Sequence, residues 1–316
     1  MNTHPHSAKP RVFIDGEAGT TGLEIRERLA LEPGVAVASI APELRKDTDA
    51  RRKLMGEVDL VVLCLPDAAA VDAVAIADSL GERAPRIVDA STAHRTAEGW
   101  VYGFPELHHG QADVIRTARR VANPGCYPSG GIALVRPLVD AGLMPADFPL
   151  TVNAVSGYSG GGKAMIESYE AARTAPDFEL YGLGLAHKHV PELQRFGGLS
   201  RRPIFVPSVG NFRQGMLVSI PLHLDMLTGA PSGKDLQDAL EAHYRDAALV
   251  RVVPAAEAAA LNGRLDALAL NGTDQLELFV FANDDQRQAV LVARLDNLGK
   301  GAAGAAVQNI KLMLGL

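Results

Sequence analysis

The stretch Arg11-Val12-Phe13-Ile14-Asp15-Gly16-Glu17-Ala18-Gly19-Thr20-Thr21-Gly22 decides the fold of this chain. Its first half, residues 11–16, is a short apolar run of the kind that forms a buried strand. Its second half is rich in glycine and leads into residues 21–31, where apolar side chains recur at helical spacing. The sequence therefore predicts a strand, a tight glycine turn and a helix in immediate succession.

The spacing of the glycines, G-x-x-G-x-x-G, is a variant of the dinucleotide-binding fingerprint. Glycines let the backbone turn tightly and approach a pyrophosphate, while the start of the next helix offers N–H groups and the positive end of its dipole. We therefore expect Gly16, Gly19, Thr20, Thr21 and Gly22 to bind a dinucleotide cofactor. A purely structural tight turn is the alternative.

The end of the next predicted strand, residues 35–40, bears on which nicotinamide cofactor is used. An NAD site usually places an acid there to receive the ribose 2′-hydroxyl, but this chain has no acid before Glu43. Ser39 is able to donate to a 2′-phosphate, and Arg45 and Lys46 follow closely. NADP(H) is favoured, with Ser39 and Arg45 as ligands, unless Arg45 and Lys46 form only a solvated surface pair.

Strands and helices continue to alternate through the first third of the chain. Further strands are predicted at residues 59–66 and 86–91, and a helix at residues 68–80. The strand at residues 59–66 is apolar throughout, as a strand covered on both faces should be. Such alternation requires right-handed crossovers, so we expect a parallel sheet of the Rossmann type.

The pattern changes after about residue 120, where strand-like runs become longer and more amphipathic. The runs are residues 151–155, 203–207, 216–224, 249–253, 275–282 and 289–295, and the clearest helix is 232–244. These runs predict an α+β domain with a mixed or antiparallel sheet. The tail, residues 301–316, is expected to be a helix with one apolar face. The predicted fold class is α/β, a Rossmann-type parallel-sheet cofactor domain plus an α+β domain.

Composition bounds the remaining possibilities. A chain of 316 residues suits two domains, and 47% hydrophobic with 22% charged residues is typical of globular proteins. A net charge of −6 argues against nucleic acid as a partner. Two cysteines make no disulfide framework, which favours a reducing cytoplasm. The polar start, Met1–Pro10, lacks a signal-peptide core, and no stretch approaches the roughly 18 apolar residues of a membrane span.

The segment Asn123-Pro124-Gly125-Cys126-Tyr127-Pro128 leads into an apolar helix predicted from about Ser129 to Ala141. Its tight turn puts Cys126 at or near the helix N-terminus, where the dipole and N–H donors lower the pKa of a thiol. The thiolate is a nucleophile. A lone cysteine is more often a small core residue, an interpretation that suits Cys64 in its apolar strand. We therefore predict Cys126 as the catalytic nucleophile.

The segment Ala186-His187-Lys188-His189-Val190-Pro191-Glu192 offers a proton-transfer partner for the thiol. On a strand, His187 and His189 would share a face. We expect one of them to act as general acid–base, with His189 preferred. A metal site is the rival interpretation, but no further cluster with ligand spacing accompanies the pair, so no metal is expected. A surface role is the remaining alternative.

Several of these segments resemble motifs of the N-acetyl-gamma-glutamyl-phosphate reductases of arginine biosynthesis. The matching segments are Gly16–Gly22, Tyr102–Leu107, Asn123–Pro128, His187–Glu192 and Asn297–Asn309. Ser129 stands where many members carry Thr, and residues 206–216 resemble the shorter subtype of the family. That departure leaves open which arginine of residues 206–216, if any, touches substrate.

The resemblance implies the fold of aspartate-semialdehyde dehydrogenase and glyceraldehyde-phosphate dehydrogenase, in which the C-terminal helix returns to the cofactor domain. It places the NADP-binding domain at residues 1–122 plus 297–316, and the catalytic and oligomerisation domain at residues 123–296. It also implies a homo-oligomer, usually a dimer or a tetramer.

The matched motifs add residues to the expected site. Ser156 and Gly157, in a Ser-Gly-x-Ser-Gly run, are expected near the nicotinamide or the substrate phosphate, with a flexible glycine loop as the alternative. Lys300, in the tail motif, is expected to join the cofactor site. The residues expected to bind substrate are Arg95, which is otherwise a surface salt-bridge residue, Asn123 and Glu192.

The implied reaction is the NADPH-dependent reduction of N-acetyl-gamma-glutamyl phosphate to N-acetylglutamate 5-semialdehyde, with phosphate release, through a thioester on Cys126. A same-fold reductase of aspartyl phosphate or N-acetyl-aminoadipyl phosphate is the nearest alternative, since it shares the thiol chemistry. A non-catalytic NADP sensor is the alternative from another class. Such a sensor would have no use for a cysteine at a helix start beside a histidine pair.

Overall fold

A computed structural model describes residues 9–171 and 175–316, so residues 1–8 of the polar start lie outside it. The chain divides into two compact units. The first unit comprises Met1–Gly103, Asp113–Asn123 and Ala306–Leu316, and the second comprises Phe104–Ala112 and Pro124–Ala305. Residues 297–305, expected with the cofactor domain, thus group with the second unit. The functional assignment of each domain stays a prediction.

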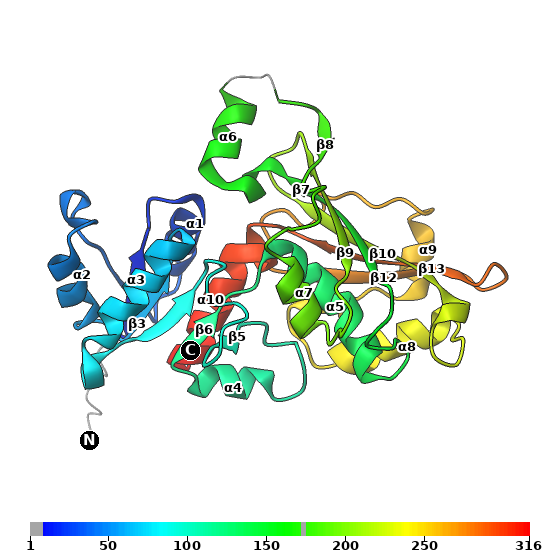
Figure 1. The fold of residues 1–316 in the computed structure, drawn as a ribbon, viewed down its shortest axis with the longest axis horizontal. Coiled ribbons are helices and arrows are strands. Elements are labelled where there is room, and N and C mark those ends of the chain that lie inside the picture. The colour runs from blue at the N-terminus through cyan, green and yellow to red at the C-terminus, as the bar shows by residue number, and fades with distance from the viewer. Residues whose placement is uncertain (1–8, 172–174) are drawn as a thin grey trace, which may run out of the picture. The chain divides into compact units, whose positions relative to one another are not determined.

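The first unit is built on a parallel sheet of six strands, as the alternating pattern predicted (Figure 1). In the order β2-β1-β3-β4-β6-β5 the strands are Ala36–Ala38, Arg11–Asp15, Leu60–Leu63, Arg86–Asp89, Arg120–Ala122 and Val101–Tyr102. All four residues of β3 are buried, because helices cover a parallel sheet on both faces.

The helices of this region are α1 (Thr20–Ala30), α2 (Thr48–Met55), α3 (Asp67–Asp78), α4 (Gln111–Thr117) and α10 (Gly304–Leu314). The sequence analysis missed α2, because only its last residue, Met55, is buried and no apolar periodicity shows. Its start is nevertheless marked, since the Asp47 carboxylate accepts a hydrogen bond of 2.7 Å from Ala50 N. Local capping, not burial, therefore defines this helix.

The second unit is built on a mixed sheet of seven strands, also as predicted. In the order β11-β12-β13-β10-β7-β9-β8 the strands are Val250–Val252, Leu276–Asn283, Gln288–Leu295, Met216–His223, Thr151–Gly157, Ile204–Gly210 and Phe178–Leu180. The helices are α5 (Cys126–Asp140), α6 (Gly162–Glu170), α7 (Val190–Phe196), α8 (Gly233–Tyr244) and α9 (Ala255–Ala260). A five-residue π-helix, Gly299–Ala303, precedes α10.

Helix α5 covers one face of this sheet, against β10 and β13 (Figure 1). Two glycines permit the close approach: a Cβ on Gly130 would lie 2.9 Å from Val218 Cγ2, and one on Gly131 would lie 2.5 Å from Leu193 Cδ2. Val218 belongs to β10 and Leu193 to α7, so a larger side chain at either glycine would force these neighbours to shift. The nucleophile candidate therefore begins a helix that is seated firmly on the sheet.

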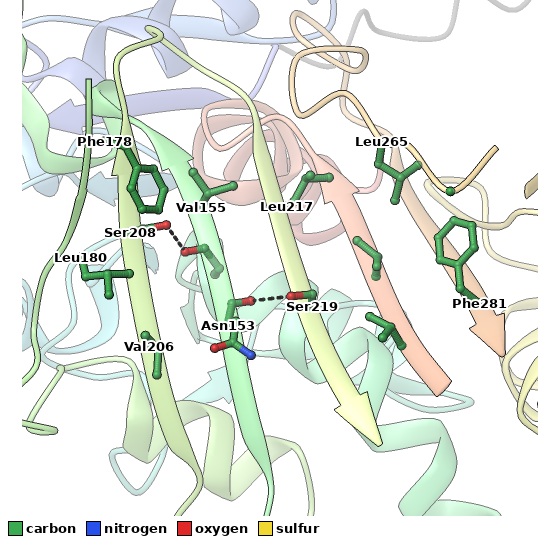
Figure 2. A pocket seen from close by; sticks show the side chains of 14 residues that line it. Asn153, Val155, Phe178, Leu180, Val206, Ser208, Leu217, Ser219, Leu265 and Phe281 are labelled. Atoms are coloured by element: carbon green, nitrogen blue, oxygen red, sulfur yellow. Dashed lines mark hydrogen bonds between the residues drawn. The ribbon is translucent and has the colours of Figure 1, made fainter. Parts of the chain in front are cut away.

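The opposite face of the same sheet carries an apolar pocket of about 660 Å³. Figure 2 shows side chains of β7, β8, β9, β10 and β12 projecting into it, among them Val155, Leu180, Val206, Leu217 and Phe281. Few polar groups interrupt it, and the Ser208 hydroxyl is satisfied by a 2.7 Å hydrogen bond to the Ala154 carbonyl. Within the described ranges, no helix is long and apolar enough to cross a membrane.

Candidate functional site

The glycine turn between β1 and α1 has the geometry of an anion cradle. Gly16 has φ +91°, and a Cβ there would lie 2.3 Å from the Cys64 carbonyl oxygen. A Cβ on Gly22 would lie 2.5 Å from the Gly16 carbonyl oxygen, and Gly19 N donates to that same oxygen at 3.0 Å. No side chain caps the start of α1 at Thr20. The first N–H groups of the helix are therefore left for an anion.

At the end of β2, Ser39 and Arg45 converge on a carboxylate of the glycine turn itself. The Ser39 hydroxyl donates to Glu17 Oε2 at 3.1 Å, and Arg45 Nη2 donates to Glu17 Oε1 at 3.2 Å. Arg26 Nη1 joins them, 2.5 Å from Glu17 Oε2. The sequence analysis missed Glu17 and Arg26, although Gly22 and Arg26 are four apart on α1 and so share the face that meets the turn.

Cys126 is the first residue of α5, three residues before the predicted start of that helix. Gly125 is the N-cap and no side chain caps the helix. The Glu192 carboxylate instead accepts a hydrogen bond of 2.7 Å from Gly125 N. Glu192 is 1% exposed, so this contact makes it a residue that fixes the turn before Cys126. Its predicted contact with substrate stays a prediction.

His187 and His189 lie in a turn before α7 rather than on a strand, yet their rings meet with centroids 4.8 Å apart. His189 is the N-cap residue of α7, and its backbone N–H donates to His187 Nδ1 at 3.2 Å. Burial, and secondarily the charge of Lys188, lowers the pKa of His187 to about 4. His187 is therefore a neutral imidazole near pH 7, with Nδ1 as an acceptor.

Two tyrosines that the sequence analysis missed complete this group. The Tyr181 hydroxyl donates to the Tyr127 hydroxyl at 3.1 Å, which donates to the Ser208 carbonyl at 3.1 Å. The Tyr127 ring lies edge-on to both histidines, with centroids 6.1 Å from His187 and 5.9 Å from His189. Burial, with a smaller effect of the Cys126 charge, raises the pKa of Tyr181 to about 12. Both phenols are therefore neutral donors beside the thiol.

The π-helix of the tail motif packs directly on the nucleophile. A Cβ on Gly301 would lie 3.0 Å from Cys126 Cβ, so glycine is needed for this approach. The neighbouring Lys300 side chain is fully buried, and its Nζ lies 2.8 Å from both carboxylate oxygens of Glu106 and 5.2 Å from the Phe104 ring centroid. This ion pair anchors the π-helix, and the predicted contact of Lys300 with the cofactor stays a prediction.

Four further residues predicted to contact cofactor or substrate lie at the end of β7 or in the first unit. Ser156 is buried at the end of β7, and a Cβ on Gly157 would lie 2.6 Å from the Arg213 carbonyl. In the first unit, the Asn123 side-chain oxygen accepts a 3.1 Å hydrogen bond from Asn309 of α10, and Arg95 Nη2 donates to the Ala90 carbonyl at 3.3 Å. Their roles toward cofactor and substrate stay predictions.

Neither cysteine is in a disulfide, and they differ in environment. Burial, followed by the charges of Asp89 and Asp15, raises the pKa of Cys64 to about 12, so that thiol stays protonated near pH 7. Across residues 9–171 and 175–316, no group of three or more His, Cys, Asp or Glu is arranged to hold a metal ion. The two histidines and two tyrosines thus form one cluster within the second unit, and Tyr127 of this cluster follows Cys126 directly in the chain.

Comparison with known proteins identifies the family. Residues 126–297 match the family model described as "Semialdehyde dehydrogenase, dimerisation domain". A Nostoc protein named N-acetyl-gamma-glutamyl-phosphate reductase 2 is 51% identical over 317 residues, covering 98% of each chain. A Brucella ovis protein named N-acetyl-gamma-glutamyl-phosphate reductase is 55% identical over 312 residues, covering 97% of this chain and 99% of the relative.

Solved structures agree on the fold. Aspartate semialdehyde dehydrogenase II of Vibrio cholerae, complexed with ASA, superposes with a TM-score of 0.71 at 16% identity, over 98% of this chain and 99% of that chain. Aspartate semialdehyde dehydrogenase of Candida albicans, solved with NADP, gives 0.63 at 14% identity, over 97% and 98% of the chains. The structures establish the fold, and the close relatives show that this chain belongs to the N-acetyl-gamma-glutamyl-phosphate reductase family.

Proposed function

We propose that the protein reduces N-acetyl-gamma-glutamyl phosphate to N-acetylglutamate 5-semialdehyde with NADPH, in arginine biosynthesis. The observation that carries the proposal is Cys126 as the first residue of a helix without a side-chain cap, followed directly by Tyr127, whose ring meets His187 and His189. The dipole and first-turn N–H groups of α5 favour the thiolate over the thiol. The substrate follows the names of relatives that are 51–55% identical.

The first chemical step belongs to Cys126. Its thiolate attacks the acyl carbon, a carbon–sulfur bond forms, and the bond from carbon to the phosphate oxygen breaks. Inorganic phosphate leaves and a thioester on Cys126 remains. The N–H groups at the start of α5 lie at the same end of the helix as the thiol. They stabilise the oxyanion of the tetrahedral species, since they are oriented before the reaction begins.

NADPH, when bound, supplies the hydride that reduces the thioester carbon. Cys126 then leaves as the thiolate when the carbon–sulfur bond breaks, which releases the semialdehyde. Proton transfer to and from the oxygen on the reacting carbon is assigned to His189. His187, with its pKa near 4, is a weak base near neutral pH and its Nδ1 already accepts the His189 N–H. We therefore assign to His187 the positioning of His189.

The glycine turn of the first unit suits the pyrophosphate of a dinucleotide, because Gly16 and Gly22 leave no room for a Cβ and the start of α1 is uncapped. Gly16, Gly19, Thr20, Thr21 and Gly22 would hold the pyrophosphate through backbone N–H groups. Ser39 and Arg45 would bind the 2′-phosphate on the adenosine ribose of NADP(H). Ser156 and Gly157 are proposed near the nicotinamide, and Arg95 and Asn123 near the substrate.

The assembly follows from the second unit. The apolar face shown in Figure 2 belongs to the residues that match a dimerisation domain, so we propose that a second copy of the chain covers it. A dimer or tetramer is expected. The two cysteines are unbridged, which is consistent with a cytoplasmic enzyme.

The test of function is an assay of phosphate-dependent NADP⁺ reduction with N-acetylglutamate semialdehyde. Cys126→Ser is expected to lose at least about 10³-fold in kcat, because an unactivated hydroxyl replaces the thiolate. Cys64→Ser is the matched control and should keep near-normal turnover, since that thiol stays protonated. Near-normal turnover by Cys126→Ser would rule out the covalent mechanism. Running the same assay with aspartate semialdehyde and the N-acetyl-aminoadipate semialdehyde identifies the acyl chain.

A further inference from the structure

A charged cluster lies at the end of β2, next to the proposed cofactor site. Its members are Glu17, Arg26, Ser39 and Arg45. Glu17, in the glycine turn, accepts from three donors: Arg26 Nη1 at 2.5 Å, the Ser39 hydroxyl at 3.1 Å and Arg45 Nη2 at 3.2 Å. Arg26 Nη1 also donates to the Ser39 hydroxyl at 2.9 Å. Arg26 thus links the turn to the end of β2, where the 2′ position of a bound adenosine ribose is read in this class of fold.

The exposure of these side chains is asymmetric. The Glu17 side chain is 7% exposed, whereas those of Arg26 and Arg45 are 46% and 40% exposed. One buried carboxylate faces two guanidinium groups, so the cluster keeps a net charge of about +1 on its solvent side. An anion that arrives from solvent therefore meets the guanidinium donors before it meets the carboxylate.

The cluster favours a 2′-phosphate over a 2′-hydroxyl. A hydroxyl gains most from an acceptor, but the Glu17 carboxylate is 7% exposed and already accepts three of the roughly four hydrogen bonds it is able to take. A phosphate needs donors, and each guanidinium offers five N–H groups, of which the contacts with Glu17 and Ser39 engage one nitrogen per arginine. Arginine also binds phosphate with two parallel hydrogen bonds, which a hydroxyl cannot receive.

We infer that Arg26 is a further specificity-determining residue, which binds the 2′-phosphate of NADP(H) with Ser39 and Arg45. The inference rests on the proposed use of NADP(H). Glu17 holds the guanidinium of Arg26 at the end of β2, so the donor is in place before the cofactor arrives. Helix α1, which supplies N–H groups to the pyrophosphate from its first turn, thereby also supplies the side chain that reads the ribose.

The experiment is equilibrium binding of NADP⁺ and NAD⁺, measured by calorimetry on the full-length protein without substrate. These ligands differ only in the 2′-phosphate. Arg26→Gln is expected to weaken NADP⁺ binding by about tenfold or more, the range for a lost hydrogen bond to a charged group, and to change NAD⁺ binding by less than about twofold. Arg26→Lys, which keeps the charge without the fork, should restore part of the loss.

The matched control is Arg52→Gln, which removes a surface arginine of α2 that is 47% exposed and pairs with Asp49. It should bind both ligands as the unaltered protein does. If Arg26→Gln weakens both ligands equally, or neither, Arg26 does not determine specificity. If the unaltered protein binds NAD⁺ as well as NADP⁺, the proposed cofactor is wrong. Preference for NADP⁺ in the unaltered protein that survives Arg26→Gln overturns the inference on Arg26 alone.

Discussion

Only one residue separates His187 from His189, yet the fold gives the two rings different tasks. His189 caps α7, while His187 receives the backbone N–H of His189 and has its pKa lowered to about 4 by burial. We expect His189→Asn to lower kcat by about 10²–10⁴-fold, the usual contribution of a general acid–base. His187→Asn should cost less and shift KM and kcat together. An unchanged pH–rate profile in His189→Asn would contradict its role as proton carrier.

The lowered pKa of His187 also affects stability. The pKa of an unfolded histidine is near 6.5. Between about pH 6.5 and pH 4, His187 is therefore protonated in the unfolded chain and neutral in the folded chain. The free energy of unfolding should therefore fall as pH falls through that window. Urea unfolding at several pH values measures this slope. His187→Phe should flatten it and the exposed His109→Phe should leave it intact; equal slopes in all three proteins would contradict the assignment.

At the residue scale, the sequence predicts what depends on near neighbours. The glycine turn and Cys126 were found because each is set by the few residues around it. Tyr181 and Glu106 were missed, since their partners are remote: 194 residues separate Glu106 from Lys300. A buried lysine beside a glycine-rich segment looks the same in sequence as a phosphate-binding lysine, and only its partner distinguishes the two. The ion pair of Lys300 with Glu106 could therefore not be predicted from the sequence, and the predicted contact of Lys300 with the cofactor stays a prediction.

At the scale of the element, strands with clear alternation were predicted almost to their ends. Strand β13, predicted at residues 289–295, spans Gln288–Leu295, and it packs against α5. The short strands β5 and β6 were missed, because β5 has two residues and β6 three, too few to show a period. The tail helix was predicted from Gly301, but its first turns form a π-helix. That departure is enforced by tertiary contacts of Lys300 and Gly301, which no local propensity encodes.

The ion pair between Lys300 and Glu106 anchors the π-helix, and a double-mutant cycle measures how much it stabilises the fold. Removing either partner takes away the closest opposite charge of the other buried group, so Lys300→Met or Glu106→Gln alone should cost about 3–5 kcal/mol of unfolding free energy. The double variant should cost markedly less than the sum, since no buried charge remains. Urea unfolding of the four proteins closes the cycle. Additive losses would mean that the two groups act independently. Activity of the double variant should still fall, because Gly301 beside Cys126 loses its anchor.

At the scale of the whole molecule, the apolar face of the seven-stranded sheet is the surface that we propose for assembly. Leu217 lines its pocket and belongs to β10, near the middle of the sheet order. Leu217→Glu should shift the protein toward monomer in sedimentation or light-scattering measurements, because a carboxylate would be buried in an apolar interface. Leu31→Glu, at a site 84% exposed in the first unit, is the control and should leave the assembly unchanged. A fully assembled Leu217→Glu protein would place the interface elsewhere.

Cys64 lies beneath the Gly16 turn, with its thiol kept protonated by a pKa raised to about 12. A limiting amount of a soft alkylating agent distinguishes thiolate from thiol, so with the proposed chemistry it marks Cys126 and spares Cys64. The moles of label taken up then count working subunits in a preparation, without an assay and without the unstable acyl phosphate. Labelling of Cys126 would thus titrate the active sites, and the unlabelled Cys64 of the same chain would serve as the internal reference.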